Sequence, residues 1–398
     1  MFRPFARLAS LRWAFCAVLA VLLATLGCVE DNGNGKTLYA FDPGSGSVLV
    51  WNDINSVYGV GGGGTAPAPD RTIQSGQLAG ITLAWGGLVV DSGRNLIYLV
   101  TESGTVFVIT KANTQNGSIS NVSDIYSFTL GYSSQQLNNA VFGQVALDAT
   151  SNILYAQETT YDGKTTQVWV VPSVSSFNNG SNVDPSVFPP VGIAADQWGA
   201  GVAAVPGGGL FGLFGNGQTV LYDALGNGYS GARLRLGSSS GFVNANPITN
   251  VSSNVLIGGS TLLATMSTGS APSPTSLAYD PQATDLYVFD PGNASATAAV
   301  LVFRQSQFTL SGNLNQSPGR TLGDPAGNVQ NLRVLSHAPN SDWLLGANIV
   351  TAATTTSSGD GGSALLIWKN PSSGAVASIS VTLPGVTSLR GMALGGTS

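Results

Sequence analysis

Short apolar runs separated by turn-forming residues recur along the chain from residue 36 onward. In residues 86–98, 143–155 and 275–287, an apolar run ends in Asp. Six residues after this Asp comes Ile or Leu, and seven residues after it comes Tyr. Such runs, bounded by Gly, Asn, Asp and Pro, are typical of β-strands, and no window after residue 30 shows helical periodicity. The pattern predicts pairs of antiparallel strands joined by tight turns.

The strand pair recurs six times, about every 57 residues, with one longer interval inside the fourth copy. The Tyr-type positions of the six copies are Tyr39, Tyr98, Tyr155, Phe211, Tyr287 and Trp343. Each copy continues into a third apolar run, at residues 48–51, 106–109, 168–171, 220–222, 300–303 and 365–368. A fourth, variable strand is expected near 72–80, 124–130, 185–190, 255–265, 320–323 and 377–383.

A long repeat built only from strands indicates a β-propeller, because a single sheet cannot bury both of its apolar faces alone. We therefore expect an all-β, six-bladed propeller over residues 36–398, with seven blades as the alternative. Residues 390–397 match a first strand without its partner, whereas Leu38 and Tyr39 match a partner without its first strand. The C-terminal strand is expected to pair with the N-terminal strands and close the ring.

The repeat "apolar strand, Asp, turn, Leu-Tyr-Val, turn, Val-x-Val-aromatic" resembles NHL-type propeller repeats, and parts of it are shared by YVTN and SMP-30-like propellers. Residues 70–73 and 319–323 also resemble the Arg-Thr tail of some bacterial repeats of this kind. The resemblance implies a rigid scaffold whose binding face is formed by the loops between second and third strands and by the crossings between sheets. It implies blade topology much more than activity.

The N-terminus has the features of an export signal. Three arginines precede an apolar stretch of 14 residues, Trp13–Leu26, which is short for a membrane span and suits a signal peptide. The segment Thr25–Cys28 resembles the lipobox of bacterial lipoproteins, which implies cleavage after residue 27 and acylation of Cys28. The alternative is an ordinary secretory signal. We expect a signal peptide (1–27), a lipidated Cys with a tether (28–35), and an outer-membrane lipoprotein facing the periplasm or the cell surface.

Composition narrows the possible functions. The net charge is −5, and only 9% of the residues are charged, so the phosphate-neutralising surface of a nucleic-acid-binding protein is not expected. Besides Cys28 the chain has one cysteine, Cys16, inside the predicted signal peptide, so no disulfide is expected. His337 is the single histidine, and no metal-binding or nucleophile motif is present, so no cofactor or catalytic residue is expected.

Several polar and aromatic residues lie near the starts of the predicted first strands. They form a candidate binding face made of Trp85, Gln144, Trp198, Asn331, Arg333 and Arg390. Tryptophans at such positions also commonly wedge between blades, and this alternative stays open. The repeated Asp91, Asp148 and Asp280 are expected to cap turn N–H groups rather than bind calcium.

The leading hypothesis is a monomeric, lipid-anchored envelope propeller that binds a protein, or a glycan, without being an enzyme. One alternative is a periplasmic, SMP-30-like metal-dependent hydrolase or lactonase with a metal on the axis. Another is a purely structural envelope protein.

Overall fold

The structure is a computed structural model of the chain. The predicted signal peptide (1–27) and the lipidated tether (28–35) lie outside the described residues and stay predictions. The described residues are 36–130, 140–160, 166–183, 191–193, 199–207, 209–214, 219–223, 256–258, 276–290, 298–304, 313–315, 318–323, 327, 329, 332–337, 341–349, 363–374, 376–386 and 388–396.

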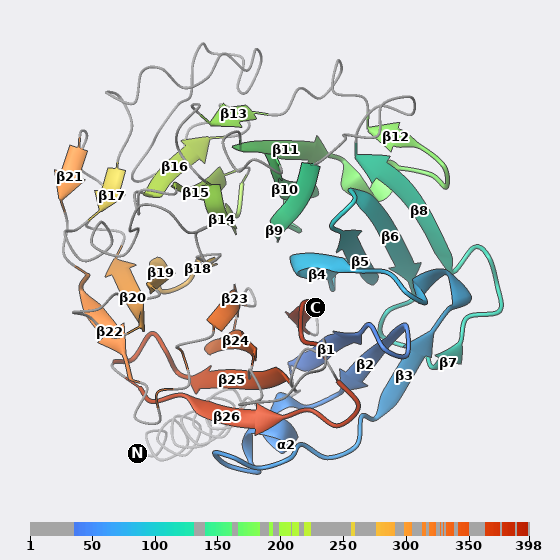
Figure 1. Cartoon of the computed structure of the whole chain (residues 1–398), viewed down its shortest axis with the longest axis horizontal. Helices are drawn as coiled ribbons and strands as arrows, with labels where there is room; N and C mark the ends of the chain where they lie inside the picture. Colours follow the sequence, from blue (N-terminus) through green and yellow to red (C-terminus); the bar gives the residue numbers. More distant parts are fainter. Residues whose placement is uncertain are drawn as a thin grey trace, which may run out of the picture. The chain divides into compact units, whose positions relative to one another are not determined.

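The described strands form six sheets, arranged around a central axis (Figure 1). In spatial order, sheet 1 contains β27 (Met392–Gly395), β1 (Thr37–Asp42), β2 (Ser47–Trp51), β3 (Arg71–Gln74) and β7 (Gly117–Ser118). Sheet 2 contains β4 (Leu83–Asp91), β5 (Leu96–Thr101), β6 (Thr105–Thr110), β8 (Ile125–Leu130) and β12 (Asn182–Val183). Sheet 3 contains β9 (Ala140–Asp148), β10 (Ile153–Thr160), β11 (Thr166–Pro172) and β13 (Val191–Ile193).

The remaining three sheets follow the same order from the axis outward. Sheet 4 contains β14 (Gly199–Val205), β15 (Gly209–Phe214), β16 (Thr219–Asp223), β17 (Leu256–Gly258) and β21 (Asn313–Asn315). Sheet 5 contains β18 (Leu277–Asp280), β19 (Asp285–Asp290), β20 (Ala299–Arg304) and β22 (Arg320–Leu322). Sheet 6 contains β23 (Leu332–His337), β24 (Trp343–Ile349), β25 (Ser363–Lys369) and β26 (Ile379–Thr382).

The arrangement is that of an all-β propeller. The innermost strands contact one another in the cyclic order β27, β4, β9, β14, β18, β23 and back to β27. Apolar side chains of neighbouring sheets interdigitate in separate cores; Tyr98 and Val100 of sheet 2, for example, lie in one core with Leu154 and Ala156 of sheet 3. Each sheet has two apolar faces, and both are buried only when a neighbouring sheet packs against each of them. A single repeat is therefore not expected to be stable on its own.

All six Tyr-type positions predicted from the repeat lie in second strands and are buried. Three of these rings lie in apolar cores together with side chains of the next sheet around the axis. Tyr39 packs with sheet 2, Tyr98 with sheet 3, and Tyr287 with sheet 6. The periodic aromatic residue therefore fills the space between sheets. This packing role explains why a large ring recurs at one point of each repeat.

The two ends of the described chain meet in sheet 1. Strand β27 pairs antiparallel with β1, with Leu38 opposite Leu394 and Ala40 opposite Met392. The Phe41 amide also donates to the Gly391 carbonyl at 3.0 Å. The first strand of sheet 1 is thus β27, and its next strands are β1 and β2.

The outer rim has a feature that the repeat does not predict. The fourth strand of a sheet pairs in parallel with a short segment from the connection between the third and fourth strands of the next sheet. The parallel pairs are Ile73 with Gly117, Thr129 with Asn182, Leu256 with Asn313, Gly323 with Ala377, and Thr382 with Thr65. These contacts cover edges that would otherwise expose unpaired backbone groups.

Five of the expected fourth strands are confirmed, as β3, β8, β17, β22 and β26. The sixth, at 185–190, lies outside the described residues, and the outermost described strand of sheet 3 is β13. The prediction of no helix after residue 30 is wrong at α2 (Ile54–Tyr58), whose first turn is capped by the Asp53 carboxylate. Two 3₁₀ turns, η1 (Gly76–Leu78) and η2 (Val174–Ser176), complete the described elements. In this part of the chain, no helix has the length and apolar character needed to cross a bilayer.

Candidate functional site

The ring of sheets has two ends, which carry different loops. At the first-turn face, the first strands end and turn into the second strands, at residues 92–95, 149–152 and 281–284. The connections between third and fourth strands lie at the same end. At the loop face, the first strands begin and the loops between second and third strands lie, including residues 43–46 and 102–104. The candidate binding residues were predicted at the loop face.

Trp85 and Arg390 come together at the loop face. The Arg390 guanidinium carbon lies 4.8 Å from the centre of the Trp85 ring, an arrangement suited to a cation–π interaction. Arg390 Nη1 also donates to the Glu102 carboxylate and to the Leu83 carbonyl, at 3.4 Å for the latter. The backbone carbonyl of Arg390 accepts from the Gly86 amide at 2.7 Å. These contacts hold an arginine and a tryptophan in one fixed geometry.

The Trp85–Arg390–Glu102 cluster is partly accessible. The side chains of Arg390 and Glu102 are 24% and 35% exposed, and Trp85 is partly buried against the apolar core shared by sheets 1 and 6. Trp85 therefore packs against a core and stays partly exposed. The two interpretations of this tryptophan, wedge and recognition residue, are compatible at this position.

Gln144, which was predicted as part of the candidate binding face, is buried instead of exposed. Its side chain is buried on the axis, where Nε2 donates to the Leu277 carbonyl at 2.8 Å and to the Leu335 carbonyl at 3.4 Å. Its Oε1 accepts from the Leu277 amide at 3.2 Å. One carboxamide therefore joins the first strands of sheets 3, 5 and 6.

The other predicted site residues are only partly placed. Arg333 lies in β23 near the loop face and is partly buried, and this burial lowers the pKa of its guanidinium. Trp198 and Asn331 lie outside the described residues, so their predicted roles stay predictions. Of the six candidate residues, the described structure brings Trp85 and Arg390 into direct contact.

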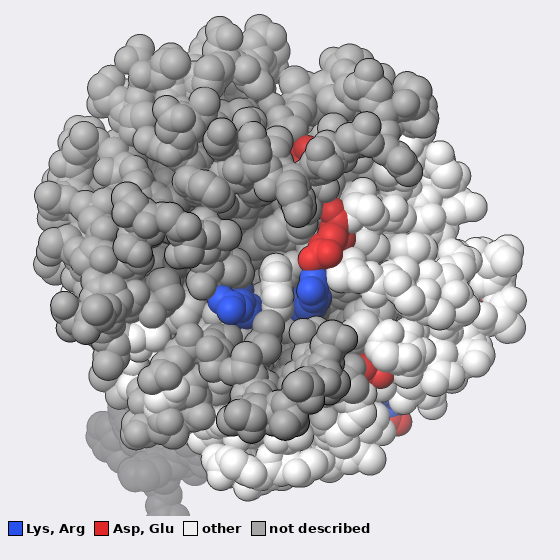
Figure 2. Space-filling model, in the orientation of Figure 1, with Lys and Arg blue, Asp and Glu red and all other residues white. Residues whose placement is uncertain are grey.

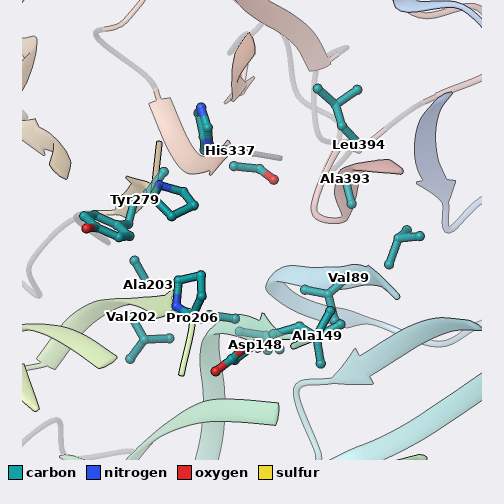
Figure 3. Close-up of a pocket in the computed structure, with 18 of the residues that line it drawn as sticks. Val89, Asp148, Ala149, Val202, Ala203, Pro206, Tyr279, His337, Ala393 and Leu394 are labelled. Atoms are coloured by element: carbon teal, nitrogen blue, oxygen red, sulfur yellow. The ribbon is translucent and has the colours of Figure 1, made fainter. Parts of the chain in front are cut away.

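A cavity of about 350 Å³ opens elsewhere, at the first-turn face (Figure 3). It is lined by the C-terminal halves of the first strands of all six sheets, and Gln144 is one of its lining residues. Most lining side chains are small or aliphatic, including Val89, Ala149, Val202, Ala203 and Leu394, which surround the space in Figure 3. The sequence prediction placed the candidate face at the other end of the ring. It missed this cavity, which is called the axial cup below.

His337 and Tyr279 belong to the wall of the cup. The His337 side chain is 1% exposed, stacks on the Tyr287 ring at a centroid distance of 5.8 Å, and has Nε2 3.5 Å from Asp280 Oδ2. Burial lowers the pKa of His337, and the nearby carboxylates of Asp280 and Asp342 only partly offset that effect. Burial likewise raises the pKa of the Tyr279 hydroxyl to about 12.

The repeated aspartates form the expected turns. Asp91 Oδ1 accepts from the Arg94 amide at 2.9 Å, Asp148 Oδ1 accepts from the Ser151 amide at 3.0 Å, and Asp280 Oδ1 accepts from the Gln282 amide at 2.8 Å. The turn-capping prediction is therefore confirmed at these three positions. Within the described part of the chain, no three His, Cys, Asp or Glu side chains are grouped as metal ligands.

Small residues in the first strands allow close contact within and between sheets. A Cβ atom on Gly87 would lie 2.4 Å from the Val100 carbonyl oxygen of the same sheet, and one on Gly391, next to β27, would lie 2.7 Å from Leu83 Cδ1 of sheet 2. A larger side chain at either position would push neighbouring strands apart. The crowding is geometric and needs no functional explanation.

In Figure 2, basic and acidic groups among the described residues meet near the central hollow. The surrounding described surface in that view carries mostly uncharged residues. A small set of fixed charged groups at a mouth is typical of a recognition site, in which a few polar groups set orientation.

Comparisons with known proteins identify no family for this chain. No family model matches the chain. No curated protein sequence matches it significantly. Among solved structures, the chain is similar to one described as dihydro-heme d1 dehydrogenase NirN in complex with DHE, with 7% sequence identity and a TM-score of 0.36, over 90% of this chain and 74% of that one. At this low similarity the match carries no inference about fold or chemistry, and the propeller assignment rests on the strand pairing of the chain itself.

Proposed function

We propose that the protein is a lipid-anchored β-propeller of the bacterial cell envelope that binds a protein partner at its loop face. The observation that carries the proposal is the Trp85–Arg390–Glu102 cluster. Tryptophan and arginine are the side chains that most often dominate binding energy in protein interfaces, particularly when neighbouring contacts hold them rigid. Here an ion pair and a ring contact fix both residues before any partner arrives.

The scaffold in this proposal is a closed, six-bladed ring built from NHL-like repeats. Support comes from the cyclic contacts of the innermost strands and from the pairing of β27 with β1. The parallel pairing of Thr65 with Thr382 adds a second contact between the sheets that contain the two chain ends. A rigid ring holds loops of different length on one face, which is how such scaffolds commonly obtain specificity.

The anchor is proposed at Cys28, in the outer membrane, on the basis of the lipobox-like segment Thr25–Cys28. Metabolic labelling with palmitate tests it directly: the wild-type protein is labelled, and Cys28→Ala is not. Mass analysis of the mature N-terminal peptide adds a second readout. Equal labelling of both proteins would contradict the anchor without touching the binding proposal.

Partner binding is tested by capture from crosslinked cell envelopes. We expect wild-type protein to enrich one consistent partner, and Trp85→Leu and Arg390→Met to lose it. Ser118→Ala, in the outermost strand of sheet 1, is the control and keeps the partner. Melting temperatures of all four proteins show whether the two loop-face variants remain folded, since Trp85 also packs against a core.

The outcomes also separate this proposal from its alternatives. Retention of the partner by both loop-face variants would move the binding site elsewhere on the ring. No enriched partner, together with stoichiometric calcium and lactone hydrolysis by the purified protein, would favour a metal-dependent hydrolase. No partner and no activity would favour a purely structural role.

A further inference from the structure

We propose that the first-turn face is a docking surface for an anionic phospholipid membrane, so that the loop face points away from that membrane. This inference rests on the proposed anchor at Cys28 and deepens it, because an anchor alone does not fix orientation. Three features of the described residues support it: the point where the chain enters the ring, the exposed charges and the exposed apolar side chains.

The chain enters the ring at the first-turn face. Lys36, the first described residue, is part of the wall of the axial cup at that face. Its carbonyl accepts from the Ile54 amide at 3.1 Å, and the next residue, Thr37, pairs with Gly395 at the end of β27. Eight residues lead from Cys28 to Lys36, and each spans at most about 3.6 Å, so the anchor lies within roughly 29 Å of this face.

Exposed positive charge gathers at the same face. The exposed basic residues of the described chain are Arg94, Lys111, Arg304 and Lys369, which lie in a first turn or at the ends of third strands. Among the described residues of this face, one acidic side chain, Asp70, is exposed to the same degree. Arg94 and Lys111 pair with Asp91 and Asp124 of the same face, whose side chains are only 1% and 13% exposed, so the cationic bias is one of the exposed groups. Basic residues close to a membrane are attracted to anionic headgroups.

Exposed apolar side chains show the same bias. The two large hydrophobic residues that are exposed in the described chain are Val60, at 37%, and Val122, at 81%. Both lie in connections between a third and a fourth strand, the segments that flank the first-turn face. Apolar side chains beside basic ones are typical of surfaces that rest at the headgroup boundary.

The orientation is measurable with single fluorescent labels. Cys28 is the one cysteine of the predicted mature chain, and an acylated thiol does not react with a maleimide, so Val122→Cys and Ser103→Cys each provide one reactive site. The labelled, lipidated full-length proteins are placed in vesicles of phosphatidylethanolamine and phosphatidylglycerol that carry a nitroxide quencher on the headgroup. We expect several-fold stronger quenching at position 122 than at position 103. Equal quenching, or stronger quenching at position 103, overturns the inference.

The charge contribution is tested on the Val122→Cys background. Adding Lys111→Gln and Arg304→Gln lowers the quenching in phosphatidylglycerol vesicles and leaves it unchanged in phosphatidylcholine vesicles. Ser45→Gln on the loop face is the matched control, with no effect in either lipid. Quenching that is insensitive to both lipid charge and the double variant would contradict docking through anionic lipid.

The two proposals fail in different ways. Mass analysis of the same preparations shows whether Cys28 carries the lipid. An unmodified Cys28 removes the anchor and the orientation together. A lipidated Cys28 with the wrong quenching pattern removes the orientation alone.

Discussion

Arg71 Nη1 in sheet 1 donates at 3.0 Å to the carbonyl of Ala112, which follows the third strand of sheet 2. The same nitrogen donates to the Gln115 carbonyl at 2.9 Å. Arg320 makes the matching contact between sheets 5 and 6, where Nη2 donates to the Pro371 carbonyl at 2.7 Å. The repeated Arg-Thr tail of the sequence therefore acts as a clamp between neighbouring sheets.

Replacing Arg71 by Met should lower the free energy of unfolding by about 1–3 kcal/mol, because hydrogen bonds from a charged group to two carbonyls are lost. Arg71→Lys, which keeps the charge but not the fork of donors, should have an intermediate effect. Urea unfolding followed by tryptophan fluorescence measures both. Lys111→Met, at an exposed side chain, is the control and should leave the unfolding midpoint nearly unchanged. An equal loss of stability in Lys111→Met and Arg71→Met would contradict a specific role of the Arg71 contacts.

Deleting residues 389–398 should destabilise the whole ring rather than one sheet. The deletion removes the partner of β1 and the buried side chains of Met392 and Leu394, each of which contributes roughly 1.5–3 kcal/mol through burial. Thermal unfolding should show a large drop in melting temperature. Deleting residues 397–398 alone is the control. An unchanged melting temperature after the longer deletion would contradict closure by the C-terminal strand.

Changing Gln144 to Leu should cost about 1–3 kcal/mol, because the Leu277 amide and carbonyl would be left without their buried partner. Gln144→Glu should be more harmful at neutral pH than at acidic pH, since a carboxylate would face the carbonyl oxygens of Leu277 and Leu335. Chemical unfolding at two pH values measures the difference. Identical losses at both pH values would count against this contact geometry.

His337 should make stability fall as the pH is lowered below about 6.5, its ordinary pKa. Burial keeps the folded-state pKa below that value, so the unfolded chain takes up a proton that the folded chain does not. The stabilising contribution is therefore complete above the unfolded pKa and is lost toward acidic pH. Comparison of wild type with His337→Gln isolates this part, because Asp285 has a raised pKa and acts in the opposite direction. Parallel pH profiles for the two proteins would refute the assignment.

The sequence predicts most of the architecture because each repeat carries its own local signals. Asp at the end of a first strand sets the turn, and Tyr in the second strand fills the space between sheets. Both signals lie within a single repeat and could therefore be predicted from the sequence. The partners of Gln144 could not be predicted in this way. Leu277 and Leu335 lie 133 and 191 residues further along the chain, and only the packing of sheets 3, 5 and 6 around the axis brings the three residues together.

The rim segments and the cup were missed for other physical reasons. Gly117 and Ser118 form a two-residue strand with no apolar pattern, and its pairing is determined by the neighbouring sheet rather than by local propensity. The cup is lined by small residues such as Ala149 and Ala203, whose types also suit close packing. A helix signal at α2 was present in Asp53, a good N-cap residue, but five residues are too few for a visible periodicity.

The position of β1 has a mechanical consequence. This strand lies between β27 and β2 and is hydrogen-bonded to both. A pulling force applied through the N-terminus would therefore load the hydrogen bonds to both neighbouring strands at once. Loading in shear requires many hydrogen bonds to break together, whereas peeling an edge strand breaks them one at a time. A chain fixed to a surface through residues before Lys36 would thus be held at the strand best placed to resist being pulled out.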